Sequence, residues 1–131
     1  MRKIYATGGW LHYPPLEFYY MQGEINVEPV QFVLPKTRKE VDLTALSYQI
    51  KAVSEDYGTE ATWILPKKLT DEHILLNWKI TRELTLMPGR VMLTLTGIDT
   101  KNNVVAKWTG NPAIIRKDPQ GTQPVPPPDK L

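Results

Sequence analysis

The sequence predicts an all-β fold, an immunoglobulin-like antiparallel β-sandwich of about 7–9 strands with an N-terminal arm and a proline-rich C-terminal tail. Twelve prolines and eight glycines divide the 131 residues into short segments, which argues against long helices. These segments are rich in Val, Ile, Thr, Tyr and Trp, and apolar and polar residues alternate along them. Because no helical crossover separates them, neighbouring strands should pair in an antiparallel sandwich, although an open barrel fits the same pattern.

Seven segments show the strand pattern, and turn residues separate them. They are residues 30–34, 43–53, 61–65, 74–80, 90–99, 104–108 and 113–116. Because successive side chains of a strand point to opposite faces, the pattern also assigns a core face. The expected core residues of four segments are Val30, Phe32, Leu34, Leu46, Tyr48, Ile50, Ala52, Ile74, Leu76, Trp78, Ile80, Val91, Leu93 and Leu95. Trp78 is the expected core anchor.

The polar segments between the strands predict particular turns. Met87-Pro88-Gly89 suits a tight turn, because proline fixes one φ angle and glycine accepts a positive one. Residues 99–103 form a polar loop, so the strands on either side should form an antiparallel hairpin that Trp108 closes. Residues 67–72 are expected to form one turn of helix, whereas residues 81–87 fit either a strand or a helical turn.

The two ends of the chain differ from its centre. Residues 1–28 are expected to form an aromatic arm or extra strands, residues 29–117 the β-sandwich domain, and residues 118–131 a proline-rich linker or tail. Half of the twelve aromatic residues lie within residues 5–20. Tyr and Trp suit contacts with sugars or partner subunits, because they combine flat apolar rings with polar atoms. The candidate contact residues are Trp10, Tyr13, Tyr19 and Tyr20; the alternative is that this segment packs against the sandwich or onto a neighbouring subunit.

The composition excludes several classes of protein. A net charge of +2, with 16 basic and 14 acidic residues interspersed, gives no electrostatic footprint for nucleic acid. There is no cysteine, so disulfides and thiolate zinc sites are impossible. No segment approaches the roughly 20 apolar residues of a membrane helix, and the N-terminus lacks the apolar run of a signal peptide. We therefore expect synthesis in a cytoplasm and no membrane insertion.

Few residues of the chain are candidates for catalysis. The two serines, Ser47 and Ser54, fall on an outward strand face and in a polar turn, outside any nucleophile elbow. The two histidines are His12 and His73. Glu17, Glu24 and Glu28 lie near the aromatic segment, but their spacing does not predict the paired carboxylates of a glycosidase. The sequence predicts a protein that is not an enzyme.

Two polar clusters resemble metal sites at first sight. Asp71, Glu72 and His73 are adjacent, but neighbouring side chains of an extended chain point to opposite faces and do not converge on one ion. The loop containing Asp99 and Asn103 lacks the alternating carboxylates of a calcium-binding loop, and Lys101 lies in its middle. Both clusters are interpreted as solvated turns, so neither a metal nor another cofactor is predicted.

Residues 31–116, about two thirds of the chain, have a recognisable order of motifs. This order resembles the N-terminal domain of baseplate upper proteins of phages that infect Gram-positive bacteria. The matching positions are Phe32, Pro35, Val41-Asp42-Leu43, Asp71, Ile74, Trp78, Gly89, Val91 and Trp108. The chain departs from the family at Asn102-Asn103, where glycine is frequent, and at "NWKI" (residues 77–80), where the family has "SWLL".

The resemblance implies a structural protein of the virion, in the tail or baseplate, made in the host cytoplasm. Such a β-sandwich adaptor docks on neighbouring tail and baseplate subunits, forms homo-oligomers and links to receptor-binding or fibre modules. Contact with a host-surface glycan would then be indirect, and the proline-rich segment would be a linker. The alternative, from the residues themselves, is a carbohydrate-binding module that uses the aromatic N-terminal segment.

Overall fold

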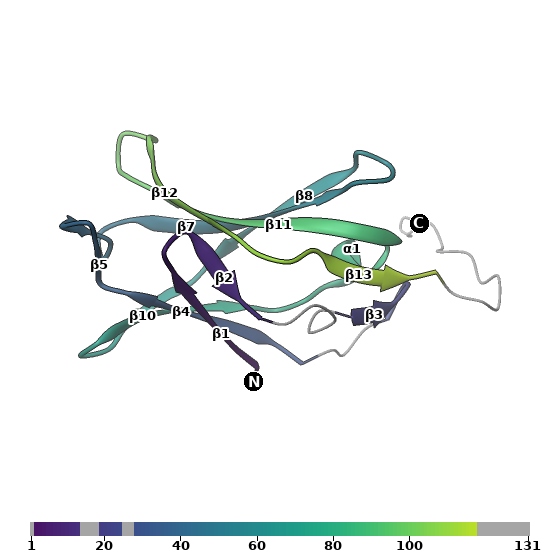
Figure 1. The fold of residues 1–131 in the computed structure, drawn as a ribbon, viewed down its shortest axis with the longest axis horizontal. Coiled ribbons are helices and arrows are strands. Elements are labelled where there is room, and N and C mark those ends of the chain that lie inside the picture. The colour runs from purple at the N-terminus through teal and green to yellow at the C-terminus, as the bar shows by residue number, and fades with distance from the viewer. Residues whose placement is uncertain (1, 14–18, 25–27, 118–131) are drawn as a thin grey trace.

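A computed structural model of the protein describes residues 2–13, 19–24 and 28–117, and this part of the chain is nearly all β (Figure 1). The strands are β1 (Arg2–Thr7), β2 (Trp10–His12), β3 (Tyr19–Met21), β4 (Val30–Pro35), β5 (Thr37–Arg38), β6 (Val41–Asp42), β7 (Ser47–Ser54), β8 (Glu60–Leu65), β9 (Lys67–Leu69), β10 (His73–Trp78), β11 (Gly89–Ile98), β12 (Val104–Thr109) and β13 (Ala113–Arg116). One short helix, α1 (Arg82–Thr85), follows β10. The expected proline-rich tail, residues 118–131, lies outside the described residues.

Eleven of the strands in the described part of the chain form one mixed sheet, in which neighbouring strands pair in the order β3-β13-β11-β12-β2-β1-β4-β10-β9. Strand β7 pairs with β11 and β8 outside this path, and β5 pairs with β6 in a separate small hairpin. The predicted antiparallel arrangement is wrong for three pairs, because β1–β4, β2–β12 and β3–β13 are parallel. Each of these pairs includes an N-terminal strand, and no tight hairpin turn connects it to its partner.

The expectation of about 7–9 strands is also too low. Outside the N-terminal region, the strands that were not predicted are β5, β6 and β9, of only two or three residues each. Such short strands contain too few residues to show an alternating pattern. Their pairing in space, and not their local sequence, defines them.

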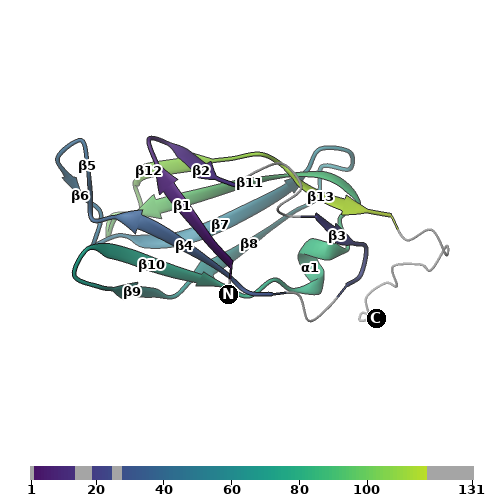
Figure 2. The same ribbon diagram turned by 60° about the horizontal axis from the view of Figure 1, so that its bottom comes forward.

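Several of the longer strands lie on opposite sides of the molecule. Figure 1 shows β7, β11 and β12 in the upper part and β4 and β10 in the lower part, which Figure 2 brings forward. A single residue pair between β12 and β2, Thr109 with Trp10, continues the sheet from one set of strands to the next. The main hydrophobic cluster contains residues from the strands on both sides.

Trp78 is buried in the core, as predicted, with only 1% of its surface exposed. Its ring stacks on Phe32 of the adjacent strand at a centroid distance of 6.0 Å and contacts Trp63 of β8 at 5.3 Å. In the other half of the core, the buried Trp108 packs against Tyr48 at 6.3 Å. These aromatic pairs connect β4 with β10, β10 with β8, and β12 with β7.

The predicted core faces of the longer strands are confirmed. All fourteen residues assigned to the core from the alternation are buried. The hairpin around residues 99–103 is confirmed as well, because β11 and β12 pair antiparallel, and Trp108 lies opposite Leu95 in their register. Gly89 has a φ angle of 95°, the positive value that the predicted turn requires.

The prediction of a helical turn at residues 67–72 is wrong. Lys67–Leu69 forms β9 and pairs with β10, with Leu69 opposite Ile74. Pairing with a neighbouring strand overrides the weak helical preference of this segment, because propensity alone contributes little. Of the two alternatives for residues 81–87, the structure shows the helical turn, α1.

The N-terminal residues contribute directly to the sheet. Strand β1 pairs with β2 on one side and with β4 on the other, so pairing crosses the expected boundary between residues 28 and 29. Ile4, Ala6 and Leu11 are buried in the main hydrophobic cluster. Arg2–Thr7 and Trp10–His12 are therefore strands of the main sheet.

Candidate functional site

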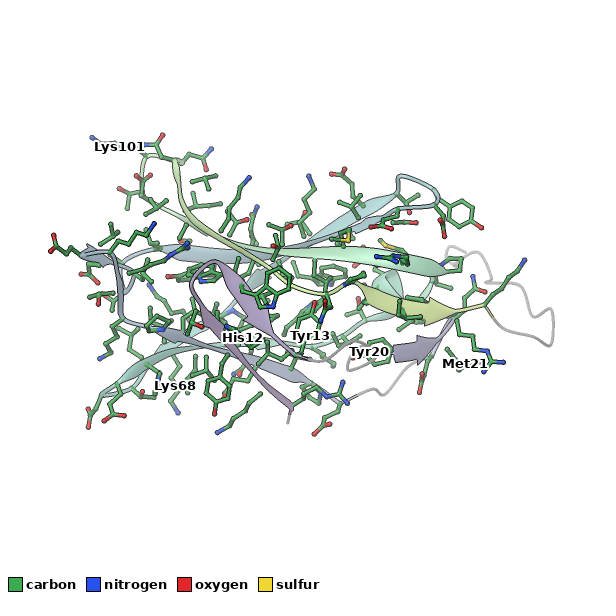
Figure 3. All side chains as sticks on the ribbon, viewed as in Figure 1. His12, Tyr13, Tyr20, Met21, Lys68 and Lys101 are labelled. Atoms are coloured by element: carbon green, nitrogen blue, oxygen red, sulfur yellow. The ribbon has the colours of Figure 1, made fainter. Side chains whose placement is uncertain are left out.

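The structure separates the four aromatic residues predicted as contact residues. Trp10 on β2 is 44% exposed, whereas Tyr13 and Tyr20 are only 7% and 6% exposed. Tyr13 follows the end of β2, and Tyr20 is the middle residue of β3 (Figure 3). The side chain of Tyr19 lies outside what the structure describes. Buried rings present no face to a sugar, so Tyr13 and Tyr20 do not form a stacking platform with Trp10.

Burial and hydrogen bonding explain the position of Tyr13. Its hydroxyl donates to the backbone carbonyl of Asn111, and the side-chain amide of Asn111 donates to the carbonyl of Tyr13 at 3.0 Å. Burial raises the pKa of the Tyr13 hydroxyl far above its usual value. This reciprocal pair attaches the end of β2 to the segment between β12 and β13, which is a structural role.

The candidate catalytic residues lie on separate elements. Ser47 is exposed at the start of β7, and Ser54 is buried at its end, where its hydroxyl accepts a hydrogen bond from the Tyr57 amide at 3.2 Å. His12 on β2 hydrogen-bonds through Nε2 to Thr7 Oγ1 at 2.7 Å, and His73 begins β10. Glu17 lies outside the described residues. Within the described ranges, no hydrogen bond joins either histidine to a serine.

The two polar clusters occupy turns. Asp71 and Glu72 are exposed between β9 and β10, and the amide of His73 donates to Thr70 Oγ1 at 3.0 Å. In the part of the chain that the structure describes, no group of three or more His, Asp or Glu residues could hold a metal ion. The second cluster is a loop held by hydrogen bonds to Asp99.

The Asp99 carboxylate organises the loop between β11 and β12. It accepts hydrogen bonds from the amides of Lys101 at 2.9 Å and Asn103 at 2.8 Å, while Lys101 itself lies at the tip of the loop (Figure 3). Asn102 has a φ angle of 67°, a conformation that asparagine tolerates better than most residues. The hydrogen bond from the Asn103 amide is the main reason why the pKa of Asp99 lies below its usual value.

We expect the carboxyl group of Asp99 to titrate below the usual aspartate value of about 3.9. A carboxylate with a lowered folded-state pKa stabilises the folded loop above the unfolded-state pKa. This stabilising contribution is lost as the pH falls through the folded-state pKa. Carboxyl carbon chemical shifts measured by NMR across an acid titration would give the pKa directly. In an Asn103→Pro variant, which lacks the amide donor, the pKa should rise; an unchanged pKa would contradict this explanation.

The most exposed large apolar side chain among the described residues lies on an edge strand. Strand β8 pairs along its length with β7, and no strand of the described residues pairs with its other side. Ile64 on β8 is 82% exposed. Edge strands are usually protected by lysine, proline or a bulge, but residues 60–65 contain neither lysine nor proline. An edge of this kind can pair with an extended segment of another chain.

A groove of about 330 Å³ borders the same strand. Its walls include Trp63 from β8, Trp78 from β10, and the prolines Pro29 and Pro66. The indole Nε1 of Trp63 donates to Thr81 Oγ1 at 3.2 Å, which fixes the ring at the groove. Mainly apolar walls with a few polar groups at the margin are typical of binding surfaces for protein segments.

The alternating pattern did not predict this surface. Residues 61–65 were predicted to form a strand, without a role for Ile64. A signal was nevertheless present, because Trp63, Ile64 and Leu65 are three consecutive apolar residues. In a strand they cannot all face the core, so the middle one must point away from it.

Comparison of the chain with models of known protein families gave no match, and a search of curated proteins gave none either. Among the described residues, no helix is long and apolar enough to cross a membrane. The candidate site is therefore defined by its geometry: an exposed apolar edge strand, β8, with an aromatic groove beside it.

Proposed function

We propose that the protein is a non-enzymatic docking domain, an adaptor of a phage tail or baseplate that binds neighbouring subunits through the edge of β8. The observation that carries the proposal is the exposed Ile64 on a strand whose outer edge has no partner strand among the described residues. The order of sequence motifs that resembles baseplate upper proteins supports the assignment to a virion. Its partners are further copies of the chain and other tail or baseplate proteins.

The arrangement of the longer strands supports the finer fold assignment that goes with this function. We propose that the strands on the two sides of the molecule form an immunoglobulin-like β-sandwich, extended by the N-terminal strands β1 and β2. The core, with Trp78 and Trp108 buried in its two halves, supports this description. In such a sandwich the β8 edge is on the outside, where a subunit can add a strand.

Self-association through β8 follows from the symmetry of homo-oligomers. Two copies that approach around a twofold axis present the same edge to each other, so their β8 strands can pair antiparallel. Ile64 and the nearby Trp63 groove would then lose contact with water. Burial of apolar surface is the main favourable contribution to such an interface.

Carbohydrate binding by the N-terminal aromatic residues remains the alternative function, with less support. It relied on Trp10, Tyr13, Tyr19 and Tyr20 acting together. Only Trp10 among the three described side chains has a substantially exposed ring.

Ile64→Lys is expected to weaken self-association about tenfold or more, which corresponds to about 1.4 kcal/mol. The substitution places a charge on the β8 edge, a common natural protection against strand pairing. Size-exclusion chromatography with light scattering over a series of protein concentrations measures the effect. Amide hydrogen exchange should show slower exchange in residues 60–65 as the concentration of the unmodified chain rises.

Val104→Lys is the matched control, because Val104 is also an exposed β-branched strand residue but lies on β12, away from the β8 edge. It should leave self-association unchanged. A chain that remains monomeric at all concentrations would contradict the proposal. Equal weakening by both substitutions would also contradict it, since a general effect of charge would then explain the result.

A further inference from the structure

A second depression, independent of β8, has a strongly basic lining. It has a volume of about 360 Å³ and lies between the β5–β6 hairpin and β12. The three cationic residues that line it are Arg38, Lys39 and Lys107. The hairpin projects from one end of the molecule (Figure 2), and Lys107 comes from a strand far away in the sequence.

The Arg38 side chain is held in place by the body of the protein. Its Nη1 donates to the backbone carbonyl of Lys107 at 3.3 Å, and its guanidinium lies 5.5 Å from the centre of the Trp108 ring. A guanidinium has five N–H donors, so this single hydrogen bond leaves the others for a ligand. A cation over the face of a buried indole is also partly fixed in orientation.

The three cations have no acidic partner among the described residues. The ion pairs in this part of the chain join Arg2 with Glu28, Lys51 with Glu60, and Arg90 with Glu55. Asp42 of β6 accepts hydrogen bonds from the amide and hydroxyl of Thr44 at 2.9 and 2.7 Å. Glu40 follows Lys39 in the turn, but no ion pair among the described residues joins the two.

The turn that presents Lys39 is strained. Lys39 and Glu40 have φ angles of 50° and 69°, and together they form the two-residue connection between β5 and β6. Two-residue hairpin turns with two positive φ angles favour Asn-Gly, because glycine adopts such angles without a steric penalty. Non-glycine residues in this conformation are concentrated at ligand-binding and switch regions.

Apolar side chains complete the depression. Val41 and Val105 are exposed, and they line it from its two sides, one from β6 and one from β12. Leu43 and Ala106 also line it and are buried. A ligand that fills the depression therefore meets positive charge together with aliphatic surface.

We propose that this depression binds a small oxyanion ligand, a phosphate or carboxylate group attached to a small apolar body. Arg38 provides paired N–H donors, the geometry that suits both kinds of oxyanion. Lys39 and Lys107 add positive charge, and the two valines contact the apolar body. The site does not depend on docking through β8, so the two can be tested separately.

The test is an NMR titration of the whole chain with four probes at constant ionic strength: inorganic phosphate, phenyl phosphate, acetate and benzoate. Saturable shifts are expected at the backbone amides of residues 38–41 and 105–107. Phenyl phosphate should bind more tightly than inorganic phosphate, and benzoate more tightly than acetate, because the ring contacts the valines. The order of phenyl phosphate and benzoate identifies which oxyanion the site prefers.

Arg38→Gln and Lys39→Gln should each weaken binding of phenyl phosphate or benzoate about tenfold, the loss of a charge-assisted hydrogen bond. Because Lys39 is exposed, Lys39→Gln should fold, and it therefore tests the site even if Arg38→Gln does not fold. Lys101→Gln removes the same charge from the β11–β12 loop, outside the lining, and should leave binding unchanged. Chemical-shift changes that do not saturate would show non-specific attraction of anions and overturn the proposal. An affinity that decreases equally in all three variants would do the same.

Discussion

Replacing Trp78 by alanine is expected to lower the free energy of unfolding by about 3–5 kcal/mol, the usual cost of removing a large buried aromatic side chain. Trp78 is 1% exposed and contacts both Phe32 and Trp63 through its ring. Its removal leaves a cavity between β4, β8 and β10, because these strands are held by their own pairing and cannot close over the space. Urea denaturation followed by fluorescence and circular dichroism measures the loss.

Trp10→Ala is the matched control for this prediction, because it deletes the same side chain from a position that is 44% exposed. Trp10→Ala removes less buried apolar surface and leaves no closed cavity. The loss in the free energy of unfolding should therefore be less than half of that for Trp78→Ala. Losses of the same size in the two variants would show that Trp78 is not the core anchor.

Gly110→Ala is expected to lower the free energy of unfolding by about 1–3 kcal/mol, the range for overpacking a well-packed site. A Cβ atom at this position would lie 2.8 Å from the carbonyl oxygen of Leu11 and 2.8 Å from the ring of Tyr13. Both neighbours are held, since Tyr13 is hydrogen-bonded to Asn111 and Leu11 belongs to β2. Alanine also lowers the conformational entropy of the unfolded chain, which favours the folded protein by about 0.4–1 kcal/mol, but this is too small to offset the clash.

The expected structural consequence is a weaker junction between β2 and β12. Only one residue pair, Thr109 with Trp10, joins these strands, directly beside Gly110. Amide hydrogen exchange should therefore accelerate first in β2, before the rest of the sheet. Ser47→Ala, at an exposed strand position, is the control and should change stability by no more than about 0.5 kcal/mol. Unchanged stability in Gly110→Ala would mean that β2 can move away without cost.

The strands of the central region could be predicted because their signal is local. Leu93, Ile50 and Ile74 face the core in strands whose polarity alternates every second residue, and this period is visible without knowledge of any partner. The prediction for residues 67–72 was wrong because this segment has no alternation. Its first three residues, Lys67–Leu69, form β9 only because β10 offers a partner edge.

The candidate surfaces were less accessible to prediction, for two different reasons. Ile64 had a local signal, three consecutive apolar residues, but pairing alone decides that its strand, β8, lies at an edge of the sheet. The basic depression has no local signal. Arg38 and Lys107 are 69 positions apart in the chain, and the hydrogen bond between them exists only in the folded protein.

The sequence by itself determined the all-β class, the longer strands and the core positions such as Trp78, because alternation is a property of each strand alone. Only the tertiary structure decided that β1 pairs parallel to β4, that Tyr13 and Tyr20 are buried, and that the edge of β8 faces outwards. Strand order and direction depend on contacts between segments far apart in the chain. The energy of those contacts comes from packing both partners together, so neither partner's sequence shows it alone.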